Sequence, residues 1–189
     1  MTTPNIDTLL DDTEERMMNA VEAMQRDFAG IRTGKASPAL VEGIQVEYYG
    51  SKVRLRDIAG ITAPEPRLLV IQPWDQNAVR SIEKAIQASD LGISPVSDGR
   101  VIRLPIPELS EERRRDLVKL VRQRAEQGRV EVRNARREAN DAAKKAEKNG
   151  EITEDDLAKM LKDIQKLTDQ YIEEIDNTLK TKEDELLQV

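Results

Sequence analysis

The chain has 189 residues, of which 38% are hydrophobic and 35% charged, with a net charge of −6, five aromatic side chains, and no cysteine or histidine. The missing cysteines exclude disulfides, thiolate nucleophiles and cysteine-ligated metal sites. The missing histidines exclude the usual general base and the commonest metal ligand, which leaves carboxylate and Ser–Lys chemistry as the open catalytic possibilities.

The N-terminal segment is predicted to form a helix that ends at Gly30. Its apolar residues recur at spacings of three, four or seven: Ile6, Leu10, Met17, Val21, Met24 and Phe28. The sequence start lacks the basic and apolar regions of a signal peptide, and no run approaches the roughly 20 apolar residues that cross a bilayer. We therefore expect a cytoplasmic protein that makes no membrane contact.

Residues 31–104 are predicted to form a small domain with both strands and a helix. The stretch 31–107 holds seven of the eight prolines and six of the nine glycines. Gly50-Ser51 and Asp98-Gly99 are hairpin turn signals, and Asp75 is placed to cap the helix. Short β-rich runs lie at residues 44–48, 52–55, 68–71 and 100–104.

Two long helices are predicted after residue 107. Ser110 is placed to cap the first, Asn149-Gly150 gives its C-terminal signal, and Thr153 with the acids after it begins the second. The short connection makes these helices antiparallel neighbours, and the N-terminal helix must join them to bury its own apolar stripe. The predicted class is α+β: an antiparallel three-helix bundle from residues 1–29 and 108–189, with the 31–104 domain inserted.

Two connections join the inserted domain to the bundle, at residue 30 and at residues 105–107. Glycine permits rotation while prolines stay stiff, so this pair of connections is predicted to act as a hinge. The predicted hinge residues are Gly30, Ile31, Leu104, Pro105 and Pro107.

The first long helix carries a row of arginines. At 100° per residue the row falls within about 60° of arc, bordered by Lys119 and Arg137. Small residues, from Gly128 to Ala142, follow a line about 100° away, so the arginines can face outward while that line packs. Guanidinium groups suit phosphate because each donates two hydrogen bonds. The row is Arg115, Arg122, Arg129, Arg133 and Arg136. The alternative is that these arginines pair with Glu126, Glu131 and the acids of the other two helices.

Three other patterns are weaker. Residues 34–37 are similar to the end of a phosphate-binding loop, but Ala36 occupies the Ser/Thr position. The acidic pairs 11–12 and 155–156 are typical of helix starts. Tyr48, Tyr49 and Trp74 could stack on bases, but we predict that they pack in the core.

Several stretches identify a family. They are residues 32–40 (Arg-Thr-Gly-Lys-Ala-Ser-Pro-Ala-Leu), 46–50 (Val-Glu-Tyr-Tyr-Gly), 82–86 (Ile-Glu-Lys-Ala-Ile) and 129–134 (Arg-Val-Glu-Val-Arg-Asn). Over nearly the whole chain the sequence closely resembles the ribosome recycling factors. Lys35 stands where the family often has arginine, and Ala135 replaces a commonly larger apolar residue.

The resemblance implies an L-shaped, monomeric, non-enzymatic translation factor with no cofactor, no metal and no catalytic residue. The family binds the post-termination ribosome near the subunit interface, with its bundle against large-subunit ribosomal RNA. It acts with elongation factor G and GTP to split the subunits and release mRNA and tRNA. Carried over by position, the RNA contacts fall on Arg114, Arg133 and Arg136, with Arg129 and Arg137 as neighbours. Two rival hypotheses remain from the residues alone: a helical interaction or chaperone module, and a carboxylate-dependent hydrolase.

Overall fold

The computed structural model describes residues 5–188, which form two compact units. Residues 29–115 make the sheet unit, and the described residues before and after them make the helical unit. The predicted α+β class, a helical bundle with an inserted sheet domain, is confirmed. Residues 1–4 and 189, which we assigned to the bundle, lie outside the described residues, and the L-shaped arrangement stays a prediction.

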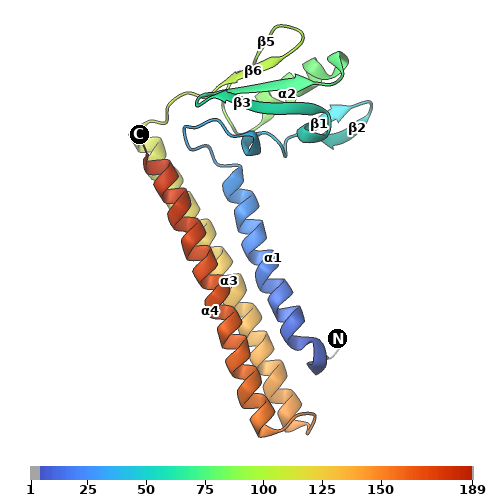
Figure 1. Cartoon of the computed structure of the whole chain (residues 1–189), viewed down its shortest axis with the longest axis vertical. Coiled ribbons are helices and arrows are strands. Elements are labelled where there is room, and N and C mark those ends of the chain that lie inside the picture. The colour runs from blue at the N-terminus through green and yellow to red at the C-terminus, as the bar shows by residue number, and fades with distance from the viewer. Residues whose placement is uncertain (1–4, 189) are drawn as a thin grey trace. The chain divides into compact units, whose positions relative to one another are not determined.

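Three helices run side by side in the bundle (Figure 1). A single 3₁₀ turn, Ile6–Thr8, leads into the first of them. Within residues 5–188 no helix is long and apolar enough to span a membrane. The helices are α1 (Leu9–Ala29), α3 (Glu111–Lys148) and α4 (Glu154–Leu187).

The ends of α3 and α4 follow from local hydrogen bonds. The backbone N–H of Arg113 donates to Ser110 Oγ at 3.1 Å, so Ser110 caps α3 as predicted. Gly150 has a φ of +73°, and the N–H groups of Gly150 and Glu151 donate to the carbonyls of Glu147 and Ala146, which is a Schellman motif. Thr153 and Asp156 then form a reciprocal capping box that begins α4.

Small side chains let the three helices approach closely. A Cβ atom added to Gly128 of α3 would lie 3.4 Å from Cδ1 of Ile175 on α4 and 3.7 Å from Sδ of Met24 on α1. Gly128 therefore marks a point where all three helices meet. Further along the bundle, Leu9 of α1 and Ile164 of α4 enclose Ala139 and Ala143 of α3 in one buried cluster.

The sheet unit contains a two-stranded and a four-stranded antiparallel sheet, with strand order β3-β4-β6-β5 in the larger one. Helix α2 (Val79–Ala88) follows a 3₁₀ turn whose start is capped by Asp75, as predicted. Its buried face, with Ile82 and Ile86, joins the strands in one apolar core. The strands are β1 (Gln45–Tyr48), β2 (Ser51–Arg54), β3 (Ala59–Glu65), β4 (Leu68–Pro73), β5 (Val96–Ser97) and β6 (Ile102–Pro105).

The predicted hinge residues Leu104 and Pro105 are not part of a free connection. They lie in β6, where they pair with Leu69 and Leu68 of β4, and Leu104 is fully buried. Ile106 is buried too, and its N–H donates to the carbonyl of Arg67 at 2.8 Å. The prolines at 105 and 107 suggested a linker, but a proline can end a strand where no ladder hydrogen bond needs its N–H.

Both chain connections are fastened at one turn of the sheet unit. The N–H of Ala36 donates to the carbonyl of Pro66 at 2.7 Å, next to the bond that Ile106 makes to Arg67. The Arg67 guanidinium also forms an ion pair with Glu108. The segments that remain between this turn and the helices are residues 30–35 and 107–110.

The close packing at Gly128 predicts opposite effects of a small and a large substitution on the stability of the bundle. Gly128→Ala should raise the melting temperature, because the methyl group meets its neighbours at ordinary contact distance and alanine favours a helix by up to about 1 kcal/mol. Gly128→Leu should destabilise the bundle by about 1–3 kcal/mol through overpacking. Thermal unfolding followed by circular dichroism tests both, and equal effects of the two substitutions would contradict the close approach of the helices.

Candidate nucleic-acid interface

The arginine row lies beside the buried stripe of α3, as the helical spacing predicts. Gly128, Val132 and Ala135 are buried against the other helices. Arg129, Arg133 and Arg136 are partly buried and Arg137 is exposed. Their guanidinium groups are therefore carried on the flank of a packed helix, which fixes the backbone from which each one extends.

Arg129 is anchored by two acids. Its Nε donates to Oδ1 of Asp176 on α4 at 2.8 Å, and its Nη2 forms an ion pair with the same oxygen at 2.7 Å. Its Nη1 donates to Oε2 of Glu126 at 3.1 Å. Only 22% of its side chain is exposed. Burial by itself lowers the pKa of Arg129, but the hydrogen bonds to Asp176 and Glu126 outweigh it, and the net shift is upward. Arg129 is thus a bridge between α3 and α4.

Arg133 is held less firmly. Its Nη2 donates to Oε1 of Glu126 at 2.6 Å, and its Nε donates to the backbone carbonyl of Arg129 at 3.3 Å. Its side chain is 37% exposed, and no bond to α4 is present among the described residues. Arg133 therefore depends on one acid from its own helix.

Arg136 and Arg137 keep their charge free of carboxylates within residues 5–188. Nη1 of Arg136 donates to the neutral side chain of Gln165 at 3.4 Å, and its Nε is buried without an acceptor. Arg137 is exposed and has neither an ion pair nor a side-chain hydrogen bond to the described part of the chain. No carboxylate of the described chain neutralises either charge, so both residues can attract an external anion.

The acid-pairing alternative is correct for part of the row. Arg122 pairs with Glu183 of α4 at 2.6 Å, and a hydrogen bond to that carboxylate raises the pKa of Arg122. Arg115 pairs with Glu111 on its own helix. Glu131, by contrast, pairs with none of the arginines in the described chain. Acids thus neutralise the row from Arg115 to Arg133, and the charge beyond Arg133 is left uncompensated.

Arg114 is not grouped with the other predicted RNA-binding residues. It lies in the first turn of α3, and that turn belongs to the sheet unit. A hydrogen bond from Arg67, the charge of Arg67 and, more weakly, the charge of Arg114 hold the pKa of Glu108 below its ordinary value. The Nε of Arg114 is buried without an acceptor. Arg114 therefore belongs to a separate electrostatic group around Glu108.

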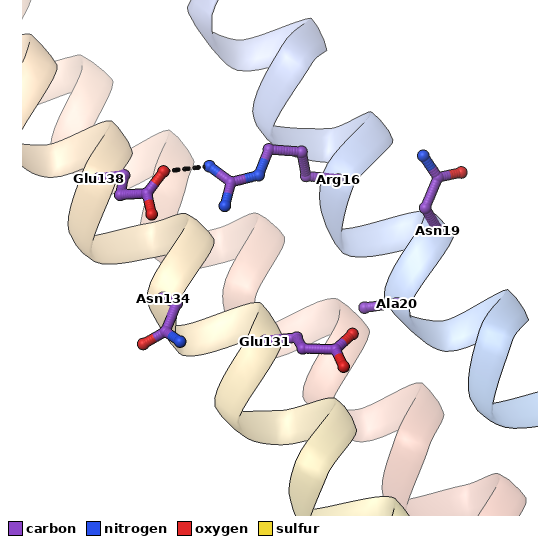
Figure 2. Close-up of a pocket in the computed structure, with 6 residues that line it drawn as sticks. All are labelled: Arg16, Asn19, Ala20, Glu131, Asn134 and Glu138. Atoms are coloured by element: carbon purple, nitrogen blue, oxygen red, sulfur yellow. Dashed lines mark hydrogen bonds and ion pairs between the residues drawn. The ribbon is translucent and has the colours of Figure 1, made fainter.

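A polar groove separates α1 from α3, and the sequence patterns did not indicate it. Figure 2 shows Arg16 extending from α1 to Glu138 of α3, and the groove is also lined by Asn19 and Ala20 of α1 and by Glu131 and Asn134 of α3. The groove has a volume of about 360 Å³, and the ion pair between Arg16 and Glu138 crosses it. Its lining contains one arginine and two glutamates, so the groove carries a net negative charge, which disfavours a phosphate.

The prediction that the aromatic residues pack in the core was wrong for two of the three. Tyr49 is 75% exposed and Trp74 is 70% exposed, whereas Tyr48 packs against the core of the sheet unit. Tyr49 and Gly50 both have positive φ and form the two-residue turn between β1 and β2, one residue earlier than predicted. Both tyrosine hydroxyls donate to Oδ2 of Asp75, at 3.0 and 2.8 Å, which fixes Tyr49 outside the core.

The sequence places this architecture in a known family. The family model described as "Ribosome recycling factor" matches residues 24–187, a range that includes all five predicted RNA-binding arginines. The chain belongs to the ribosome recycling factor family.

Full-length relatives agree with this family assignment. The ribosome-recycling factor of Halalkalibacterium halodurans is 54% identical over 96% of this chain and 98% of its own length. That of Bacillus subtilis is 50% identical over the same shares.

Solved structures agree as well. A solution structure of a ribosome recycling factor superposes with a TM-score of 0.81 at 45% identity and covers both chains completely. A second structure, at 47% identity and a TM-score of 0.70, covers 98% of this chain and all of its own; it models the Thermus thermophilus ribosome recycling factor and Escherichia coli elongation factor G bound to the E. coli post-termination complex.

The contacts of the row separate a structural arginine from a free one. Arg129→Ala should destabilise the helical unit by about 1 kcal/mol, because it removes the bridge to Asp176. Arg137→Ala removes the same charge and should leave the melting temperature nearly unchanged, since this side chain has no partner in the described chain. Equal losses in thermal unfolding would refute the distinction.

Proposed function

We propose that this chain recycles ribosomes: it binds the post-termination ribosome and, with elongation factor G and GTP, splits the subunits and releases mRNA and tRNA. Family membership over residues 24–187 and relatives of about 50% identity over nearly the whole chain support this function. The structural relative described with elongation factor G on a post-termination complex supports the choice of partner.

The proposed anchor is a contact between α3 and phosphates of large-subunit ribosomal RNA. The observation that carries it is the uncompensated charge of Arg136 and Arg137 beside the half-exposed Arg133. Planar guanidinium groups on a packed helix can each donate two hydrogen bonds to a phosphate. Arg129 contributes by holding α3 against α4, and Arg114 supplies a second contact from the first turn of α3.

The chain itself is proposed to make and break no bond. The acids whose pKa departs from the ordinary value all shift downward: Asp75, Asp98, Glu108, Glu126 and Asp156. A carboxylate hydrolase needs at least one acid with a raised pKa, so this pattern disfavours the rival hypothesis. Hydrolysis of GTP belongs to elongation factor G, and we place the chain in the cytoplasm as a monomer.

Movement is proposed to occur about the two connections. We propose that Gly30 and Ile31 belong to the first of these connections, as the sequence predicts. The second connection is proposed to run from Pro107 to Ser110. Leu104 and Pro105 are excluded because they pair within β6. In this proposal elongation factor G pushes the sheet unit, and the bundle transmits the force to contacts between the ribosomal subunits.

The double substitution Arg133→Ala with Arg136→Ala tests the RNA contact. Ribosome affinity should fall at least tenfold, since a hydrogen bond to a charged group contributes about 1.5–3 kcal/mol. The slope of log affinity against log salt should become shallower by about 1.4–1.8, because two phosphate contacts are lost. Co-sedimentation with ribosomes over a range of salt concentrations measures both quantities.

Removing Arg16 and Arg26 from α1 instead provides the control, because the bundle loses the same charge outside the row. This control variant should bind ribosomes nearly as the unaltered chain does. Comparable losses in the two double variants would mean that overall charge, and not this site, governs binding.

A lengthened connection tests the mechanical part of the proposal. Two glycines inserted between Leu109 and Ser110 leave the cap of α3 and the arginine row intact, so ribosome binding should persist. Subunit splitting with elongation factor G and GTP should fall severalfold, because a longer flexible connection transmits less displacement.

The matched insertion places two glycines after Gly150, in the turn between α3 and α4, where no hinge is proposed. Splitting should be little affected there. If the variant with the insertion after Leu109 splits subunits normally, the second connection does not transmit the force, whether or not ribosome binding changes.

A further inference from the structure

One carboxylate occupies the space between two arginines of the row. Oε1 of Glu126 accepts from Nη2 of Arg133 at 2.6 Å, and Oε2 accepts from Nη1 of Arg129 at 3.1 Å. Each oxygen therefore binds a different guanidinium group. Hydrogen bonds from Arg129 and then from Arg133 hold the pKa of Glu126 below its ordinary value, so this carboxyl stays charged.

The two arginines differ in what would hold them if Glu126 left. Arg129 keeps its hydrogen bond and its ion pair with Asp176 of α4 and would stay in place. Arg133 has no other acid among the described residues and would retain only its bond to the Arg129 carbonyl. Glu126 itself is 54% exposed, so its side chain can turn toward solvent without disturbing the core.

A phosphodiester and a carboxylate present similar groups to an arginine. Both carry one negative charge shared by two oxygens, and both accept paired guanidinium hydrogen bonds. Glu126 thus fills the positions that two phosphate oxygens would take between Arg129 and Arg133. The Arg133 donor that Glu126 occupies becomes available to an RNA phosphate when the carboxylate moves aside.

We propose that Glu126 is an internal competitor of RNA phosphate, which limits the affinity of Arg133 for ribosomal RNA and speeds release after each round. This inference rests on the proposed function and adds a residue that tunes it. A factor that must leave the ribosome after subunit splitting benefits from a ready replacement for the phosphate. Arg133 then exchanges one anion for another, and its charge is never left without a partner.

An ordinary surface ion pair is the competing explanation for Glu126. Its spacing of three residues to Arg129 is common on helices, and such pairs stabilise a helix slightly. The second bond, seven residues away to Arg133, is what the ordinary explanation does not require. The two explanations predict opposite changes in ribosome binding when the charge of Glu126 is removed.

The test is Glu126→Gln in the full chain, measured as binding to large ribosomal subunits. Glutamine keeps the size and one acceptor oxygen but loses the charge. Affinity should rise about two- to fivefold, the range equivalent to an exposed ion pair, and mainly through slower dissociation. The gain should shrink as salt is raised, because the lost competition is electrostatic. Melting temperature checks that the variant folds, and Glu126→Ala serves as the second variant.

Glu131→Gln is the matched control, because Glu131 is an exposed acid of the same helix that pairs with no arginine in the described chain. It should change affinity less than Glu126→Gln does. Equal gains in the two variants would show a general charge effect and overturn the proposal. Unchanged or weaker binding by Glu126→Gln would also overturn it, since Glu126 would then serve to orient the arginines.

Coupling to Arg133 completes the test. In a chain that already carries Arg133→Ala, Glu126→Gln should give no further gain, and an undiminished gain would overturn the proposal. The proposal for Glu126 can fail while the proposed RNA contact stands. A loss of ribosome binding in the Arg133→Ala, Arg136→Ala variant would still support that contact. If the unaltered chain bound no large subunits, the proposed function itself would fail.

Discussion

The close approach of three helices at Gly128 is the constraint on which the functional surface depends. Because α3 presents glycine and alanine to its neighbours, α1 and α4 pack near its backbone, and Met24 and Ile175 leave room at Gly128 for no side chain larger than a methyl group. Long side chains are thereby confined to the flanks of α3. This packing fixes the backbone that carries the row of arginines, and acids of α4 hold Arg122 and Arg129 as well.

The fraction of arginines that are paired with an acid falls along this flank of α3. Toward the start of α3 the arginines are matched by acids of α3 and α4, from Glu111 to Asp176. Toward its end, Arg136 meets only a neutral amide and Arg137 has no partner in the described chain. In the proposed contact with RNA, this gradient confines the affinity of an acidic protein for a polyanion to a short stretch of one helix.

The helical part of the fold could be predicted because its signals are local. The cap at Ser110, the Schellman motif at Gly150 and the small-residue stripe each depend on residues within a few turns. The strands β3 and β5 were missed, since β3 contains Gly60 and Pro64 and β5 has two residues. Pro105 was misread for a related reason: its pairing with Leu68 is set by a sheet that no local pattern reveals. The arginine row was predictable from spacing, but the choice of Asp176 and Glu183 as partners depends on how α3 and α4 pack.

The turn that holds Ala36 and Ile106 has a consequence for how this chain could have arisen. Its two acceptors, Pro66 and Arg67, are adjacent residues, so the polypeptide enters and leaves the sheet unit at almost the same point. A domain whose two ends lie close together can be inserted into a surface loop of another protein, or removed from it, without distorting either structure. The segment 36–106 therefore begins and ends at neighbouring points, which is the geometry that insertion of one domain into another requires.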